Sequence, residues 1–362
     1  MRLYQKTLFM FFCGFFCLVM QLAPLGALQA REGASPQTRQ ITDQLNRTVT
    51  IPDQVQRSVV LMHHALDIAI QLGAQDRIVG VLQKWPEMLP DAVKAMPRLR
   101  DMPMPGELSS VNMESLLQLR PDVVIVTHYA PEAMRRQIEA AGIPVLAISM
   151  YAADYEQASR LNPALKDPDE AYTKGMDAAI RILGEVYGKE QRAAELMATI
   201  RRNRALLAEY LGKVDDRQRV RCYMANPDLH TYGSGKYTGV IMSRAGCSNV
   251  AAALEGYKQV NMEDILRWDP QVILVQDRYR QVADEIRGSA SWSNVAAVRD
   301  KRIYVTPEFV KPWGHPTPES MALGELWMAR TFYPDAFAGL DLERLVNSYY
   351  QTFYGIEYSG AY

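Results

Sequence analysis

The hydrophobic pattern of the chain changes at about residue 48. From there on, short apolar runs rich in β-branched residues alternate with longer mixed segments; the first of these runs are residues 58–62, 78–81, 123–126 and 144–148. The runs have the length and composition of buried strands, and the segments between them end at glycine or proline, as helices do. This alternation predicts a parallel sheet covered by helices on both faces.

The same alternation occurs again later in the chain. The apolar runs of this second part are residues 219–224, 272–275 and 302–305. Residues 166–212 are helical by composition, with Gly188 as the expected break. We therefore predict two Rossmann-like three-layer α/β lobes, residues 48–165 and residues 213–362, joined by one long helix within residues 166–212. The ligand cleft is expected between the lobes, at the carboxyl ends of the strands.

A sixteen-residue unit is present in both parts. Residues 111–126 align without a gap on residues 260–275, and eight of the sixteen positions are identical, including the opening Val-Asn-Met-Glu. Each unit has the pattern of a short helix capped by its asparagine, with the glutamate near the positive end of the helix dipole. A proline then ends the helix ahead of a buried strand. The repeat supports two similar lobes.

The first thirty residues differ from the rest. Arg2 and Lys6 precede an apolar run over residues 8–20, and the segment closes on small residues up to Ala30. This three-part organisation is typical of a secretory signal peptide, and the run is too short for a membrane-spanning helix. An N-terminal membrane anchor is the alternative interpretation. Residues 31–47 are polar and are expected to form a loose leader.

Charge and cysteine content narrow the class of partner. The formal net charge of −1 argues against nucleic acid or an anionic membrane as the main partner. Cys13 and Cys17 lie inside the apolar run without the small preceding residue of a lipoprotein signal, which disfavours a lipid anchor. Cys222 and Cys247 remain in the exported chain, where they form either one disulfide or two buried thiols.

Candidate ligand-binding side chains follow the predicted strands or lie in loops on the same side. We expect a crevice between the lobes lined by imidazoles, aromatic rings and an arginine, which suits a flat or anionic metal complex. The residues are His63, His64, Trp85, His128, Tyr129, His230, Tyr232, Arg278, Tyr279, Trp313 and His315. The alternative is that loops collect histidine and tyrosine without a shared role.

Direct metal binding is a sharper alternative. It requires three or four of the histidines His63, His64, His128, His230 and His315 to converge, and the sequence has no Cys-x-x-Cys or His-Glu-x-x-His motif. We therefore assign no metal ligand directly. Met102 and Met104 are soft-metal ligands by type, but loop or core packing explains them more simply. Residues 233–237, Gly-Ser-Gly-Lys-Tyr, lack the spacing and hydroxyl of a phosphate-binding loop.

The combination of signal peptide, two lobes, connecting helix and repeated Asn-x-Glu unit resembles the substrate-binding proteins of ABC importers for iron-siderophore, haem and cobalamin. The resemblance covers about residues 48–337, and residues 246–250 look like the family's Gly-Gly-x-Asn-Val turn with Cys247 in place of a glycine. In that family two helix-borne glutamates meet arginines of the permease. The resemblance therefore implies a permease-docking role for Glu114 and Glu263, with dipole stabilisation as the alternative.

The resemblance implies a periplasmic protein that captures a metal chelate and delivers it to an ABC transporter permease in the inner membrane. We expect a ferric siderophore or a similar iron complex, with nickel or cobalt chelates, haem and cobalamin as alternatives. No catalytic residue, cofactor or nucleic acid partner is expected, and we expect a monomer. A secreted metal-dependent hydrolase or chelatase is the alternative from another functional class.

Overall fold

The computed structural model describes residues 37–215, 217 and 219–362. It separates into two units, Met1–Gln37 and Thr38–Tyr362, and the account below concerns the second. The predicted signal peptide, residues 1–30, lies outside the described residues. No helix among the described residues has both the length and the apolar character needed to cross a membrane.

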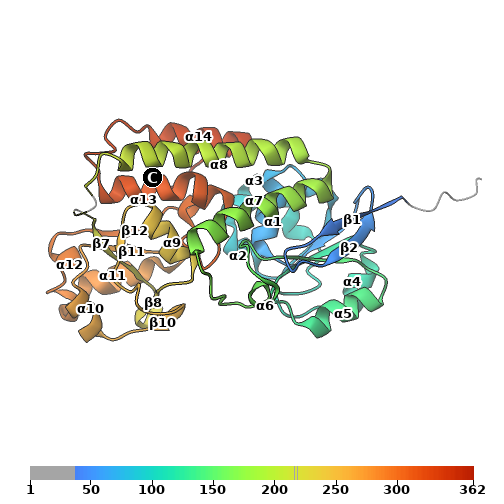
Figure 1. Cartoon of the computed structure of the whole chain (residues 1–362), viewed down its shortest axis with the longest axis horizontal. Coiled ribbons are helices and arrows are strands. Elements are labelled where there is room, and N and C mark those ends of the chain that lie inside the picture. Colours follow the sequence, from blue (N-terminus) through green and yellow to red (C-terminus); the bar gives the residue numbers. More distant parts are fainter. Residues whose placement is uncertain (1–36, 216, 218) are drawn as a thin grey trace, which may run out of the picture. The chain divides into compact units, whose positions relative to one another are not determined.

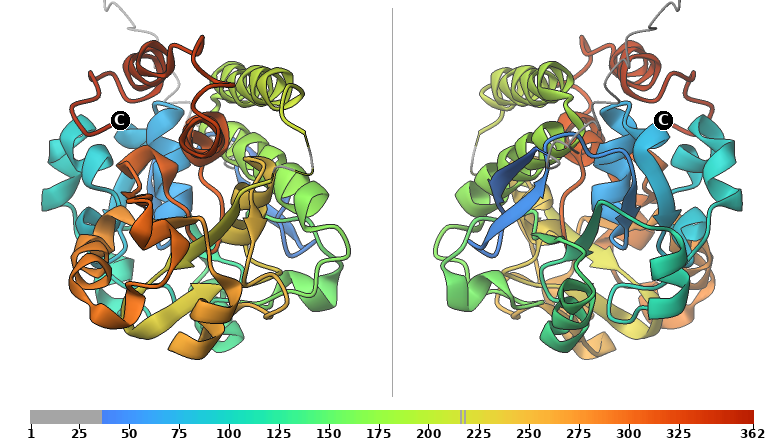
Figure 2. Two further views of the ribbon diagram at one scale, coloured as in Figure 1. Left: turned by 90° about the vertical axis from the view of Figure 1, so that its left-hand side faces the viewer. Right: turned by 90° about the vertical axis from the view of Figure 1, so that its right-hand side faces the viewer.

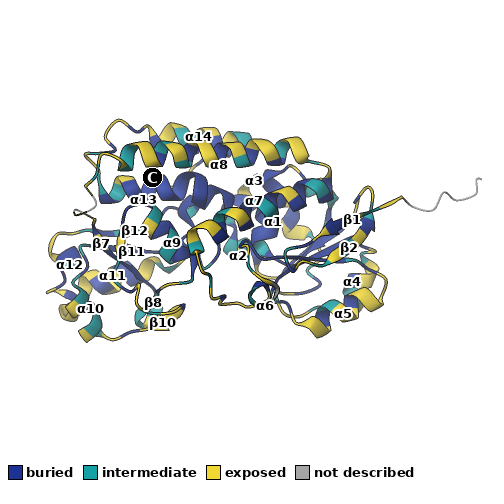
Figure 3. Cartoon of the chain, in the orientation of Figure 1, coloured by how far each residue is buried: buried dark blue, intermediate teal, exposed yellow. Residues whose placement is uncertain are grey.

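A four-stranded parallel sheet forms the core of the N-terminal lobe, with strand order β4-β3-β5-β6. Its strands are β3 (Ser58–Val60), β4 (Ile78–Val81), β5 (Val123–Thr127) and β6 (Val145–Ile148). Every residue of β5 and β6 is buried, as expected for strands with helices on both faces (Figure 3). The helices of this lobe are α1 (His63–Gln71), α2 (Trp85–Met88), α3 (Pro90–Ala95), α4 (Met113–Gln118), α5 (Glu132–Ala140) and α6 (Tyr155–Ala158).

Two segments of the N-terminal lobe differ from the sequence prediction. Part of the predicted polar leader forms the strand β1 (Thr38–Thr42), which pairs antiparallel with β2 (Thr48–Pro52). Only Ile41 of β1 is fully buried, so the strand lacks a strong apolar pattern. Trp85 and Pro86, expected in a loop, begin the short helix α2, because proline is well tolerated in the first turn.

The C-terminal lobe has a second parallel sheet, with strand order β12-β11-β7-β9. Its strands are β7 (Arg221–Ala225), β9 (Ser248–Asn249), β11 (Val272–Val275) and β12 (Ile303–Val305). A separate antiparallel pair joins β8 (His230–Tyr232) to β10 (Tyr257–Gln259). The helices are α9 (Tyr237–Arg244), α10 (Met262–Trp268), α11 (Arg280–Gly288), α12 (Ala296–Arg299), α13 (Glu325–Phe332) and α14 (Leu342–Phe353).

The repeated unit forms the same structure in both lobes. The side chain of Asn112 accepts a hydrogen bond from the backbone N–H of Ser115 at the start of α4, and Asn261 does the same for Asp264 at the start of α10, both at 2.9 Å. Each helix is followed by a buried strand of its sheet. The predicted caps are thus confirmed. A disulfide joins Cys222 of β7 to Cys247 just before β9, with 6.1 Å between their Cα atoms.

The predicted connecting segment is two helices rather than one. α7 (Pro168–Tyr187) ends at Gly188, whose φ of 62° suits glycine, and α8 (Glu190–Leu211) runs back beside it (Figure 1). With its 22 residues, α8 is about 33 Å long, enough to pass from one lobe to the other. α8 lies along the same side of the unit as α13 and α14, which both views in Figure 2 also show.

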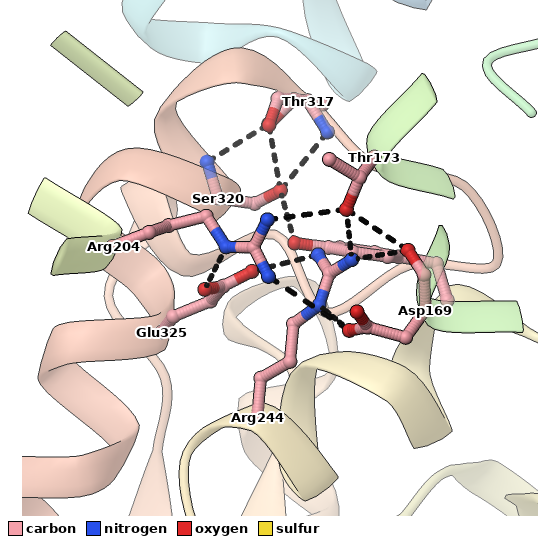
Figure 4. Close-up of polar contacts among 8 residues, drawn as sticks. Asp169, Thr173, Arg204, Arg244, Thr317, Ser320 and Glu325 are labelled. Carbon is pink, nitrogen blue, oxygen red and sulfur yellow. Dashed lines mark hydrogen bonds and ion pairs between the residues drawn. The ribbon is translucent and has the colours of Figure 1, made fainter. Parts of the chain in front are cut away.

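A buried ionic cluster fixes these helices to one another (Figure 4). Glu325 of α13 accepts hydrogen bonds from Arg204 of α8 at 3.2 Å and Arg244 of α9 at 2.9 Å. Arg244 also bonds to the carboxylate of Asp169 and the hydroxyl of Thr173, both on α7. The carboxylates of Glu325 and Asp169 and two guanidinium groups therefore hold four helices together.

The last helix of the chain returns to the N-terminal lobe. Tyr354, which follows α14, donates to Asp67 of α1 at 2.6 Å, and Tyr349 donates to Gln71 of α1, also at 2.6 Å. Tyr350 donates to Asp91 of α3 at 2.7 Å. The predicted C-terminal lobe, residues 213–362, thus includes a helix that bonds to the other lobe.

Candidate functional site

The carboxyl ends of strands from both sheets carry the rings of one cluster. His63 and His64 follow β3, His128 follows β5 and Tyr151 follows β6. From the other lobe, the loop after β12 contributes Trp313 and His315. We refer to these six residues, His63, His64, His128, Tyr151, Trp313 and His315, as the histidine cluster.

The rings of the histidine cluster contact one another across the two lobes. His64 lies 5.7 Å from Trp313 and 5.8 Å from His315, measured between ring centroids. His128 lies 5.3 Å from His315 and 5.0 Å from Tyr151. Side chains separated by up to 252 positions, from His63 to His315, therefore meet in one enclosed site.

Burial disfavours the charged form of the imidazoles in the cluster. Burial, followed by the positive charges of Arg278 and Lys311, lowers the pKa of His63 to about 3. Burial lowers the pKa of His128 to about 4, and the pKa of His315 also lies well below its ordinary value. A neutral imidazole carries one N–H donor and one acceptor nitrogen.

Several of these donors have no partner in the protein. Among the described residues, Nδ1 of His63, Nε2 of His315 and Nε1 of Trp313 are buried without a hydrogen bond. Buried polar atoms are normally paired, because leaving one unpaired costs about 1–3 kcal/mol. These unpaired nitrogens mark places where oxygen atoms of a ligand would be bound.

Cationic side chains surround the cluster. The guanidinium carbon of Arg278 lies 5.2 Å from the ring centre of Trp313 and 5.1 Å from that of Tyr279. The ammonium of Lys311 lies 5.6 Å from the Trp313 ring and is bound by two buried carboxylates, Asp67 at 3.2 Å and Glu319. The site therefore combines neutral N–H donors with positive charge, which favours an anion.

Most of the predicted ligand-binding residues lie at this site, and two do not. Five of them belong to the histidine cluster: His63, His64, His128, Trp313 and His315. The ring of Tyr129 packs on that of His128 at 4.8 Å between centroids, and the ring of Tyr279 lies 5.1 Å from the guanidinium carbon of Arg278. Burial raises the pKa of Tyr232, and the positive charge of the nearby Arg278 offsets part of this rise. His230 instead stacks on Tyr257 in the small antiparallel sheet. Trp85 is fully buried and has no ring contact with the cluster among the described residues.

Three residues in or beside the histidine cluster were not predicted from the sequence. Tyr151 lies in a segment with no distinctive motif, and Lys311 looked like an ordinary loop lysine. Lys236 belongs to the Gly-Ser-Gly-Lys-Tyr segment that fails as a phosphate-binding loop. The glycines around Lys236 were the signal in the sequence for a binding segment, because glycine lets the backbone approach a ligand closely.

The histidines do not form a metal site in this structure. Within residues 37–215, 217 and 219–362, no three His, Cys, Asp or Glu side chains are placed to share a metal ion. Met102 and Met104 are partly buried and pack against the core of the N-terminal lobe.

The family profile described as "Periplasmic binding protein" matches residues 59–309, more than half of the chain. The chain belongs to this family of periplasmic binding proteins. It is therefore a substrate-binding protein of the ABC transporter class and not an enzyme. The fold is an α/β fold with two parallel sheets, as predicted.

Similar proteins identify a more specific relationship. The chain is 51% identical over 322 residues to the molybdate-binding protein MolA of Haemophilus influenzae, covering 88% of this chain and 92% of MolA. The solved structure of MolA bound to molybdate superposes with a TM-score of 0.85 at 50% identity, over 89% of this chain and 100% of that one. A periplasmic solute-binding protein of Veillonella parvula shares the fold, with a TM-score of 0.72 at 21% identity over 89% and 94% of the two chains.

The predicted ligand class is wrong. We expected a ferric siderophore or similar iron complex, but the relative that shares half its residues with this binding protein is named for an oxyanion. The sequence pattern indicated rings at the ends of strands but not their spacing, which is 5.8 Å between the centroids of His64 and His315 and 5.3 Å between those of His128 and His315.

Proposed function

We propose that this protein captures molybdate, a small tetrahedral dianion, between its two lobes and delivers it to an ABC transporter permease. The observation that carries the proposal is the enclosed histidine cluster, in which His63, His315 and Trp313 keep unpaired nitrogens next to Arg278. Oxyanions are bound by N–H donors and positive charge, and the half-identical MolA is named for molybdate. The predicted signal peptide would place the protein in the periplasm.

The size of the site supports an inorganic anion over a larger one. The ring of His315 lies 5.8 Å from that of His64 and 5.3 Å from that of His128, so a ligand of a few oxygen atoms at His315 is close to both. His63 and His64 lie in the first turn of α1, where the positive end of the helix dipole adds to the attraction for an anion.

Isothermal titration of the purified protein tests the ligand. Molybdate and tungstate, which have the same shape and charge, are expected to bind with one site per chain, and ferric catecholates and nickel-histidine are expected not to bind. Sulfate, a smaller dianion of the same geometry, measures selectivity. Absence of heat and of any change in tryptophan fluorescence with both molybdate and tungstate would contradict the proposal.

The permease-docking role of Glu114 and Glu263 is part of this proposal. Both glutamates are exposed, in the first turns of α4 and α10, and those helices lie on the side of the unit away from α8 and α14 (Figures 1 and 2). Neither carboxylate forms an ion pair with a described residue. They are therefore available to arginines of a partner.

Charge reversal tests docking separately from ligand binding. We expect E114K combined with E263K to leave molybdate affinity unchanged while reducing uptake in cells by more than about tenfold, since like charges at a contact repel. The control is E343K, an exposed glutamate of α14 on the opposite side. Normal uptake with the double variant, or lost affinity, would refute the docking role.

A further inference from the structure

Lys236 is a buried cation without a carboxylate partner. It precedes α9, its side chain is largely buried, and the residue is 6% exposed. Its ammonium donates to the backbone carbonyl of Leu161 at 2.7 Å. Among the described residues no Asp or Glu forms an ion pair with it, although Asp167 and Asp169 line the same surface cavity of about 490 Å³.

Two other buried cations of the protein have carboxylate partners. Lys311 has Asp67 and Glu319, and Arg244 has Glu325 and Asp169. Burying a charge without a counterion costs several kcal/mol. A buried cation without a carboxylate partner therefore indicates a place where a bound anion supplies the counterion. The contrast makes Lys236 unusual within this molecule.

Lys236 also lies against the histidine cluster. A Cβ atom added to Gly314, between Trp313 and His315, would lie 3.6 Å from Cδ of Lys236 and 4.0 Å from its ammonium nitrogen. Burial, and to a smaller extent the charge of Lys236, lowers the pKa of His128 and of His315. Lys236 is therefore part of the site wall.

The carbonyl that holds Lys236 belongs to a loosely packed segment. Residues 152–166 connect β6 to α7 and contain only the short helix α6. A hollow of about 890 Å³ separates much of this segment from α7. The carbonyl of Arg160, next to Leu161, accepts from Nε2 of His128 at 3.2 Å and from the hydroxyl of Tyr151 at 2.7 Å.

The carbonyl oxygens of Arg160 and Leu161 thus accept hydrogen bonds from His128 and Lys236, two donors that an anion would otherwise use. We propose that Lys236 is an anion-binding residue of this site, and that the carbonyl oxygens of Arg160 and Leu161 hold the positions of ligand oxygens until the anion binds. This inference rests on the proposed function. When the anion takes over Lys236 and His128, residues 152–166 lose two of their contacts with the site and become more accessible.

The binding test uses K236M, which removes the charge but keeps an apolar chain of similar length. Titration with molybdate is expected to give a dissociation constant weaker by about 100-fold, because a buried charge contact is lost. K236R is expected to retain most of the affinity, and K258M, at an exposed lysine of β10, to bind like the wild type. Circular dichroism confirms that each variant is folded.

The outcomes separate the two proposals. A wild-type protein that binds neither molybdate nor tungstate overturns the proposed function, and this inference fails with it. A wild type that binds, together with K236M of equal affinity, overturns the inference alone. If K236M does not fold, K236Q takes its place, with the same expectation and the same contradictory outcome.

Limited trypsin digestion tests the displaced segment. Arg160 is exposed, so cleavage after it, followed by mass spectrometry of the fragments, reports on residues 152–166. We expect molybdate to speed this cleavage in the wild type, and K236M to be cleaved as fast without molybdate. Slower or unchanged cleavage of the wild type with saturating molybdate would overturn the place-holding role of the carbonyls.

Discussion

At the scale of single residues, the site combines neutral donors with a few charges. Four imidazoles whose charged form is suppressed by burial provide N–H groups without adding repulsion among themselves. The charge comes from Arg278 and Lys236 at the edges, while Lys311 is already neutralised by Asp67 and Glu319. This division lets four rings lie close together beside positive charge, as the proposed binding of a dianion requires.

If the protein binds molybdate as proposed, the pH dependence of binding follows from Lys236. Burial lowers its pKa to about 8, so the ligand-free protein carries the charge below about pH 8 and loses it above. Binding above that pH must first restore the proton, so affinity is expected to fall by up to about tenfold per pH unit between about pH 8 and about pH 9.5. Titrations across this range measure the slope.

K236M provides the control for that slope. His128 and His315 face Lys236 and stay neutral above about pH 7, because burial lowers their pKa. Asp67 and Glu308 have pKa values raised to about 7 and about 8, mainly by burial, and titrate in the same range. Their contribution remains in K236M, so the difference between the two curves belongs to Lys236. Parallel curves would contradict the assignment.

Sequence reasoning placed His128 at the candidate site but missed Tyr151 after β6, Lys311 after β12 and Lys236. His128 comes directly after β5, and its position at the carboxyl end of a parallel strand is dictated by the fold. Lys236 lies outside the main sheet and reaches the site through the placement of α9, a tertiary effect. Trp85 was misplaced because a tryptophan before proline has the same pattern in a loop and in a helix start.

At the scale of elements, the connecting helices carry the mechanical link between the lobes. α7 and α8 are held to α9 and α13 by Glu325 and its two arginines. The break between them was predictable from Gly188 alone, but their packing side by side was not, since it depends on side chains from four helices. β1 was missed because its only fully buried residue is Ile41.

Removing the charge of Glu325 tests this ionic cluster. E325Q leaves Arg204 and Arg244 facing each other in a buried site, and we expect a loss of about 3–5 kcal/mol in the free energy of unfolding. E132Q is the matched control, because Glu132 pairs with Arg136 on the exposed surface of α5, and its loss should stay below about 1 kcal/mol. Urea denaturation measures both. Equal effects would show that burial of the cluster contributes nothing.

At the scale of the whole described unit, the two lobes share one buried polar network. Lys311 and Glu319 of the C-terminal lobe meet Asp67 of α1, and Tyr354 bonds to the same Asp67. Opening the lobes at this point would expose an ion pair that is now fully enclosed. The sequence contained no sign of this network, because its members are spread from residue 67 to residue 354.

Y354F tests the contribution of this network to stability. The variant removes the donor to Asp67 and the acceptor for Gln71, leaving a buried carboxylate oxygen unpaired, so we expect a loss of about 1–3 kcal/mol. Y362F, at an exposed tyrosine, is expected to change stability by less than about 0.5 kcal/mol. Unfolding followed by fluorescence and circular dichroism should remain a single transition. An unchanged stability of Y354F would contradict the role of Tyr354.

The return of α14 to the N-terminal lobe has a consequence for the order in which the protein is completed. Asp67, Gln71 and Asp91 belong to segments synthesised early, yet their partners Tyr354, Tyr349 and Tyr350 are made almost last. Until those residues emerge from the ribosome, the first lobe contains polar groups that the finished fold buries. The first lobe therefore reaches its final packing only after these three tyrosines are available.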